Sequence, residues 1–192
     1  MDKNIIVYCT SGLGNRLRSL ASSAVISEDT DRNLKVYWDN IIPNGCLAKW
    51  DELFENNIEQ IDLTQMQSMD DCYVCCEKYD ADREFWHFKN PTLKILTDKY
   101  GALGKNGFNY GVENKNIVIF NNNFLPNVDT TKTNRWLGDL KPIKEISDKI
   151  SEIEKSLNLS KDVIGIHARG SDFGVSVDYY LDTINQSIKS NP

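Results

Sequence analysis

Three side chains near the C-terminus have the types and spacing expected for phosphate binding. His167, Arg169 and Asp172 lie in a short stretch that also contains Gly170 and Ser171. The guanidinium of Arg169 is a fixed positive charge with a planar donor fork, which suits the oxygens of a phosphate. An ion pair between Arg169 and Asp172 alone is the structural alternative, and the spacing leaves both interpretations open.

This stretch lies between an apolar run and a helical pattern. Residues 163–166 predict a buried strand, and apolar side chains recur at helical spacing over residues 177–188. A strand, a glycine-containing loop and a helix in this order place the loop at the carboxyl end of a sheet strand. Backbone N–H groups at the start of the helix then favour an anion.

A second glycine turn lies near the N-terminus. Residues 4–8 predict a buried strand, and a helix is expected to open at about Asn15, after Gly12 and Gly14. Arg16 then lies in the first turn of this helix, where the helix dipole disfavours a cation. Its position indicates an anion or polar-ligand site, unless the side chain lies on a solvated face.

The same turn matches the dinucleotide fingerprint G-x-G-x-x-G only in part. Leu17 stands in the place of the third glycine, which close helix–strand packing requires. Asp39 follows the second predicted strand, residues 34–38, where an acid that binds a ribose would lie. A Rossmann oxidoreductase that binds NAD or FAD is therefore one alternative.

Strands and helices alternate along the chain, which predicts an α/β protein. The stretch of residues 55–116 shows no clear pattern. The other expected elements are a short helix at 50–54, a strand at 117–120, a helical region beginning at Trp136 and an amphipathic helix from Ile143 to Leu157.

Composition excludes several classes of protein. The chain has 192 residues, 40% of them hydrophobic and 26% charged, with a net charge of −6. An acidic chain is not expected to bind nucleic acid. The apolar run at residues 5–8 is too short for a membrane span or a signal peptide, so we expect no transmembrane segment and a cytoplasmic protein.

The five cysteines are expected to be reduced thiols. Cys72, Cys75 and Cys76 form a C-x-x-C-C cluster without a second cysteine pair at zinc-ribbon spacing. Because a structural zinc site needs four ligands, we expect no metal site in this cluster.

Together, the G-L-G-N-R-L turn and the H-x-R-x-x-D motif resemble the fucosyltransferase superfamily of α1,2-, α1,6- and protein O-fucosyltransferases. Further similarity lies at residues 34–38, Cys46, residues 51–54 and residues 140–142. The resemblance implies a GT-B glycosyltransferase. We therefore expect a Rossmann-like acceptor-side domain over residues 1–160 and the first strand–helix unit of the nucleotide-sugar donor domain over residues 161–192.

The resemblance also implies an activity: inverting, metal-independent transfer of fucose from GDP-fucose to a glycan or other hydroxyl acceptor, with no cofactor. A fixed guanidinium then stabilises the charge that develops on the leaving diphosphate. Val177 stands where some relatives have an acidic residue, so no general base is assigned. The residues implied are Arg169 as the catalytic residue and, for donor binding, His167, Gly170, Ser171, Asp172, Gly12, Gly14, Asn15 and Arg16.

Only twenty residues follow Asp172, too few for a complete donor domain. We expect a second chain or a missing C-terminal part to complete it. The alternative is a noncatalytic or truncated domain that binds a nucleotide or a sugar.

Overall fold

The computed structural model describes residues 3–39, 46–69, 72–76, 95, 98–99, 102–104, 115–120, 124–125 and 127–158. The predicted strand and motif at 163–172, with every candidate residue in them, lie outside these ranges. The chain divides into two compact units, residues 1–147 and 148–192. The predicted domain boundary at residue 160 remains a prediction.

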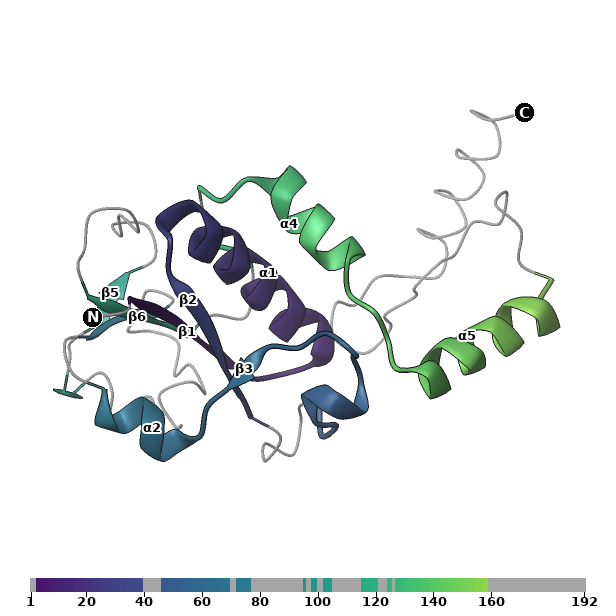
Figure 1. The fold of residues 1–192 in the computed structure, drawn as a ribbon, viewed down its shortest axis with the longest axis horizontal. Helices are drawn as coiled ribbons and strands as arrows, with labels where there is room; N and C mark the ends of the chain where they lie inside the picture. The colour runs from purple at the N-terminus through teal and green to yellow at the C-terminus, as the bar shows by residue number, and fades with distance from the viewer. Residues whose placement is uncertain are drawn as a thin grey trace, which may run out of the picture. The chain divides into compact units, whose positions relative to one another are not determined.

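The described part of the first unit is built on a parallel sheet with the strand order β3-β2-β1-β6-β4-β5 (Figure 1). β1 lies inside the sheet between β2 and β6, so its carboxyl end is flanked on both sides. The α/β class is confirmed. The strands are β1 (Asn4–Cys9), β2 (Asn33–Trp38), β3 (Glu59–Gln60), β4 (Cys72–Cys76), β5 (Ala102–Gly104) and β6 (Asn116–Phe120).

Helices cover both faces of this sheet. Helix α1 (Leu13–Thr30) and helix α4 (Thr130–Gly138) lie on one face, and helix α2 (Leu63–Ser68) lies on the other (Figure 1). Side chains alternate between the faces along each strand. In β1, Tyr8 packs into the core beneath α2, whereas Val7 and Cys9 pack into the core beneath α1.

Two helices begin earlier than the sequence predicts. Helix α1 starts at Leu13 rather than near Asn15, because Gly12 adopts an extended conformation and serves as the N-cap. Helix α4 starts at Thr130 rather than Trp136. Its N-cap is Asp129, whose carboxylate accepts hydrogen bonds from the amides of Thr131 (2.8 Å) and Lys132 (3.3 Å). The short helix near Trp50 is confirmed as a 3₁₀ helix, η1 (Trp50–Glu52).

Helix α5 (Lys144–Ser156) confirms the predicted amphipathic helix. Ile150, Ile153 and Leu157 of its apolar face are exposed to solvent. No described helix combines the length and the apolar character that a membrane crossing needs.

Candidate anion-binding site

The turn between β1 and α1 lies at the carboxyl edge of the sheet. The chain leaves β1 at Cys9, and the next two residues, Thr10 and Ser11, are buried. Ser11 has φ of 69°, in the left-handed region that non-glycine residues rarely adopt. The tertiary structure therefore holds this turn in a conformation that its local sequence does not favour.

The N-terminus of α1 is open. No side chain caps the helix at Gly12, and the amides of Asn15 and Arg16 both donate to the Gly12 carbonyl (3.0 and 3.2 Å), so the amides at the very start of α1 are the ones that another acceptor could bind. A methyl group added at Gly12 or at Gly14 would meet no described atom within 4 Å, and neither glycine has a positive φ. Neither packing nor backbone conformation among the described residues therefore demands glycine here, whereas close approach of a ligand would.

Arg16 lies buried at this turn. Its side chain is 0% exposed, its Nε donates a hydrogen bond to the Ser11 carbonyl (2.7 Å), and its guanidinium lies 4.8 Å from the centre of the Trp38 ring. Its two terminal nitrogens are buried and find no acceptor among the described residues. Arg16 is thus not on a solvated face, and its terminal nitrogens are unsatisfied within the part of the chain that the structure describes.

Burial lowers the pKa of Arg16, because it removes the charged guanidinium from water. Nearby groups that act in the opposite direction are Cys46, Cys9, Asp39 and Tyr8, in that order of effect. Burial also disfavours the charged form of the Cys9 thiol and so raises its pKa to about 12, although the positive charge of Arg16 opposes this shift. The turn therefore carries a buried positive charge.

The structure adds two residues that the sequence did not single out. The hydroxyl oxygens of Thr10 and Ser11 are buried and have no hydrogen-bond partner among the described residues. Asn15 is half-buried, and its side-chain oxygen accepts a hydrogen bond from Arg18. Two adjacent hydroxyl residues directly before a glycine turn were the available sequence signal for Thr10 and Ser11.

Asp39 does not have the exposure expected of a ribose-binding acid. It is 4% exposed, and its carboxylate accepts a hydrogen bond from the Tyr8 hydroxyl at 3.0 Å. Together with Leu17 in place of the third glycine, this burial leaves the dinucleotide-binding alternative without support at this turn.

The cysteine cluster lies in strand β4, where alternate side chains point to opposite faces. Cys72 packs in the core beneath α2, and Cys75 packs in the core on the other face. These two thiols therefore do not converge on one point. Over the described ranges, no three His, Cys, Asp or Glu side chains gather as metal ligands would.

The structure thus brings together four of the predicted residues, Gly12, Gly14, Asn15 and Arg16. His167, Arg169, Gly170, Ser171 and Asp172 lie outside the described residues, and their roles remain predictions. A helix N-terminus without a side-chain cap, a buried guanidinium whose terminal nitrogens find no acceptor in the described part of the chain, and two hydroxyls in the same state together suit an oxyanion.

No protein-family model and no curated protein sequence matches the chain. Its fold is similar to crystal structures of a fucosyltransferase, NodZ from Bradyrhizobium, with a TM-score of 0.60 and 14% identity over 99% of this chain and 67% of that one. Similar structures include the NodZ α-1,6-fucosyltransferase soaked with GDP-fucose (TM-score 0.59, 15% identity, 98% and 66% covered) and the same enzyme co-crystallised with GDP (TM-score 0.59, 15% identity, 99% and 67% covered).

The chain therefore has a fucosyltransferase-like fold and spans about two thirds of the length of those chains. At 14–15% identity, the likeness establishes the fold alone.

Proposed function

We propose that this protein forms at least part of an inverting, metal-independent fucosyltransferase that transfers fucose from GDP-fucose to a glycan or another hydroxyl acceptor. The fold similarity to a fucosyltransferase soaked with GDP-fucose carries this proposal. The open, cationic turn at the start of α1 supports it independently, because a nucleotide sugar presents a diphosphate.

In the proposed reaction, an acceptor hydroxyl oxygen forms a bond to C1 of fucose while the bond from C1 to the β-phosphate oxygen breaks. The acceptor proton passes to a base, and GDP leaves from the opposite face. Positive charge develops on the sugar ring and negative charge on the diphosphate. Groups that bind the diphosphate more tightly as it gains charge lower the barrier.

Arg16 and the first turn of α1 supply such groups in the first unit. The two terminal nitrogens of Arg16 are buried and find no acceptor among the described residues, and such donors destabilise the empty protein because they have lost water and gained no partner. A bound diphosphate would satisfy these donors, together with the Thr10 and Ser11 hydroxyls and the helix N–H groups. We assign this turn to donor binding, and Arg169 keeps the role in phosphate binding that the sequence resemblance implies.

A noncatalytic nucleotide-binding domain would use the same turn. One experiment separates the two functions: the chain is incubated with GDP-fucose and a panel of hydroxyl acceptors in excess chelator, and both binding and GDP release are followed. The proposal predicts acceptor-dependent release of GDP with formation of a fucosylated product. Binding without release would instead establish the noncatalytic function.

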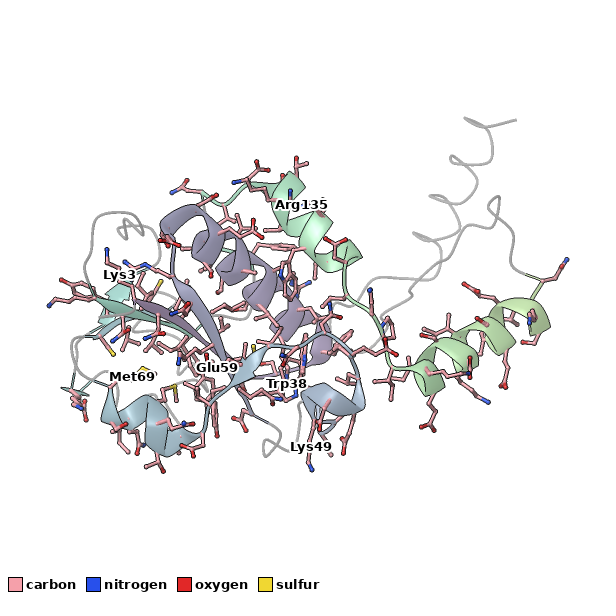
Figure 2. The ribbon with its side chains drawn as sticks, viewed as in Figure 1. Lys3, Trp38, Lys49, Glu59, Met69 and Arg135 are labelled. Carbon is pink, nitrogen blue, oxygen red and sulfur yellow. The ribbon has the colours of Figure 1, made fainter. Side chains whose placement is uncertain are left out.

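Arg169→Ala tests the assignment of the second motif. We expect it to weaken GDP binding by roughly a hundredfold, since a charge-assisted bidentate contact to phosphate contributes about 3 kcal/mol. Arg135→Ala is the matched control, because Arg135 is an exposed arginine on α4 that pairs with Glu28 (Figure 2). Equal GDP affinity in the two variants would remove Arg169 from the donor site.

A further inference from the structure

An aromatic ring lies against the buried cation of the turn. Trp38 ends β2, beside Cys9 at the end of β1, and is 9% exposed in the core beneath α1. The centre of its ring lies 4.8 Å from the Arg16 guanidinium, within the roughly 6 Å over which an aromatic face attracts a cation. Because this attraction acts on the charge itself, it offsets part of the cost of removing that charge from water.

Two contacts hold the ring of Trp38 in place. Its indole Nε1 donates a hydrogen bond to the Ala48 carbonyl at 2.8 Å, and its ring meets the ring of Trp50 edge to face, with 5.4 Å between the ring centres. Trp50 is fixed in turn, since its own Nε1 donates to the Asn56 carbonyl at 2.8 Å. The orientation of the Trp38 ring beside Arg16 is therefore set by its neighbours.

Arg16 is itself held at two points. Its Nε donates to the Ser11 carbonyl at 2.7 Å, and the Trp38 ring lies against the guanidinium. Its two buried terminal nitrogens have no acceptor within the described ranges. A guanidinium that is already fixed loses little side-chain freedom when these nitrogens bind an oxyanion, so both contacts favour binding.

We propose that Trp38 is a positioning residue for the oxyanion at this turn: its ring holds the Arg16 guanidinium so that the two terminal nitrogens meet the anion. Trp38 donates no hydrogen bond to the anion, because its one side-chain N–H is bound to the Ala48 carbonyl. It acts through Arg16. The identity of the anion as the diphosphate of the donor rests on the proposed function, whereas the positioning of Arg16 does not.

The first experiment measures binding of inorganic pyrophosphate to the chain by calorimetry. Trp38→Leu removes the aromatic face and should weaken binding at least roughly fivefold, whereas Trp38→Phe keeps an aromatic face and should stay within about twofold of wild type. Trp136→Leu is the matched control, because Trp136 packs against the same core from α4. It should lower the thermal midpoint and leave pyrophosphate affinity unchanged.

Three results would overturn the positioning role. The first is a folded Trp38→Leu variant that binds pyrophosphate as tightly as wild type. The second is an equal loss of affinity in Trp38→Phe and Trp38→Leu, since the aromatic face would then not be the cause. The third is an equal loss in Trp136→Leu, since weakening the core would then be sufficient. Thermal unfolding of each variant shows whether it is folded.

The second experiment uses the wild-type protein and so does not depend on the folding of a Trp38 variant. NMR follows the indole N–H signals of Trp38 and Trp136 while pyrophosphate is added. We expect the Trp38 signal to shift in proportion to the bound fraction, because its ring lies against the guanidinium that binds the anion, and the Trp136 signal to stay in place. A Trp38 signal that does not respond to bound pyrophosphate would overturn the positioning role.

A parallel titration with GDP separates this role from the proposed function. Trp38-dependent binding of pyrophosphate without binding of GDP would count against the fucosyltransferase and leave the positioning role intact. Equal GDP affinity in wild type and in folded Trp38→Leu would overturn the positioning role and leave the proposed function intact. A wild-type chain that does not bind pyrophosphate would overturn the oxyanion site and, with it, the role of Trp38.

Discussion

Replacement of Gly14 by alanine separates the stability of the turn from its function. Gly14 is exposed and lies in the first turn of α1, and a Cβ added there would meet no described atom within 4 Å. If glycine is there only for folding, alanine should destabilise the protein or leave it unchanged. If glycine is there to admit a diphosphate, alanine should stabilise the empty protein and weaken ligand binding.

The expected magnitudes follow from helix propensity. Alanine is more favourable than glycine inside a helix by about 0.5–1 kcal/mol, because it loses less backbone entropy on folding. For a domain of this size, that gain raises the midpoint of thermal unfolding by about 1–4 °C. A methyl group that displaces one phosphate oxygen from a helix N–H should cost roughly tenfold in affinity, or about 1.4 kcal/mol.

Thermal unfolding measures the first effect, and the amide NMR shifts of residues 12–16 during a GDP titration measure the second. The matched control is Gly138→Ala. Gly138 is the last residue of α4, and a methyl group added there would likewise meet no described atom within 4 Å. This control should raise stability by a similar amount and leave the GDP titration unchanged.

A stabilised Gly14→Ala variant that binds GDP as tightly as wild type would refute the ligand-binding role of Gly14, because the open space would then not belong to the ligand. A destabilised variant would contradict it in another way, since it would reveal a packing or backbone constraint that requires glycine at this position.

Three further substitutions test other parts of the structure. Ser11→Gly should stabilise the empty protein by about 1 kcal/mol, measured by urea unfolding, because glycine adopts a left-handed φ without strain. Met66→Ala should cost about 2–5 kcal/mol in the same assay, since Met66 is 0% exposed in the core beneath α2. Hydrogen bonds from the Thr131 and Lys132 amides lower the pKa of the Asp129 carboxyl. The ionised cap therefore stabilises the fold fully at pH values above the ordinary Asp pKa, and this stabilisation is lost as the pH falls through the lowered pKa. Thermal midpoints should therefore drop more steeply on acidification below about pH 4 in wild type than in Asp129→Asn, and parallel profiles would contradict this role.

The central strands could be predicted from the sequence because each is a run of apolar, largely β-branched residues. β1 and β6 are buried on both faces of the sheet, so each is a continuous apolar run in the sequence and shows no alternation of apolar and polar residues. The first glycine turn could be predicted for the same reason: it follows such a run directly and precedes a helical pattern.

The segment between η1 and β6 could not be predicted in this way. β3 and β5 have two and three residues, and α2 has six, too few for a periodic pattern to show. β3 is held by pairing with β2, and β5 by pairing with β4, so these elements depend on partners distant in sequence. A helix cap is the kind of local sequence signal that this segment does contain: Asp62 and Gln65 exchange hydrogen bonds at the start of α2.

The state of Arg16 also could not be predicted from its position in a helix. Its burial depends on Trp38, which comes from the end of β2 and lies under the guanidinium. Its terminal nitrogens find no acceptor among the described residues, and this follows from how the elements around the turn pack together. Sequence spacing suggested a ligand near Arg16, but only the tertiary structure shows that its guanidinium is buried rather than solvated.

Equilibrium titration of the chain with GDP-fucose, GDP and a UDP-sugar, by calorimetry in excess chelator, tests the proposed donor site most directly. We predict saturable binding of GDP-fucose and GDP without any divalent metal, at least roughly tenfold tighter than binding of the UDP-sugar. Absence of binding by GDP-fucose, or equal affinity for the UDP-sugar, would contradict the assignment of a GDP-fucose site to this chain.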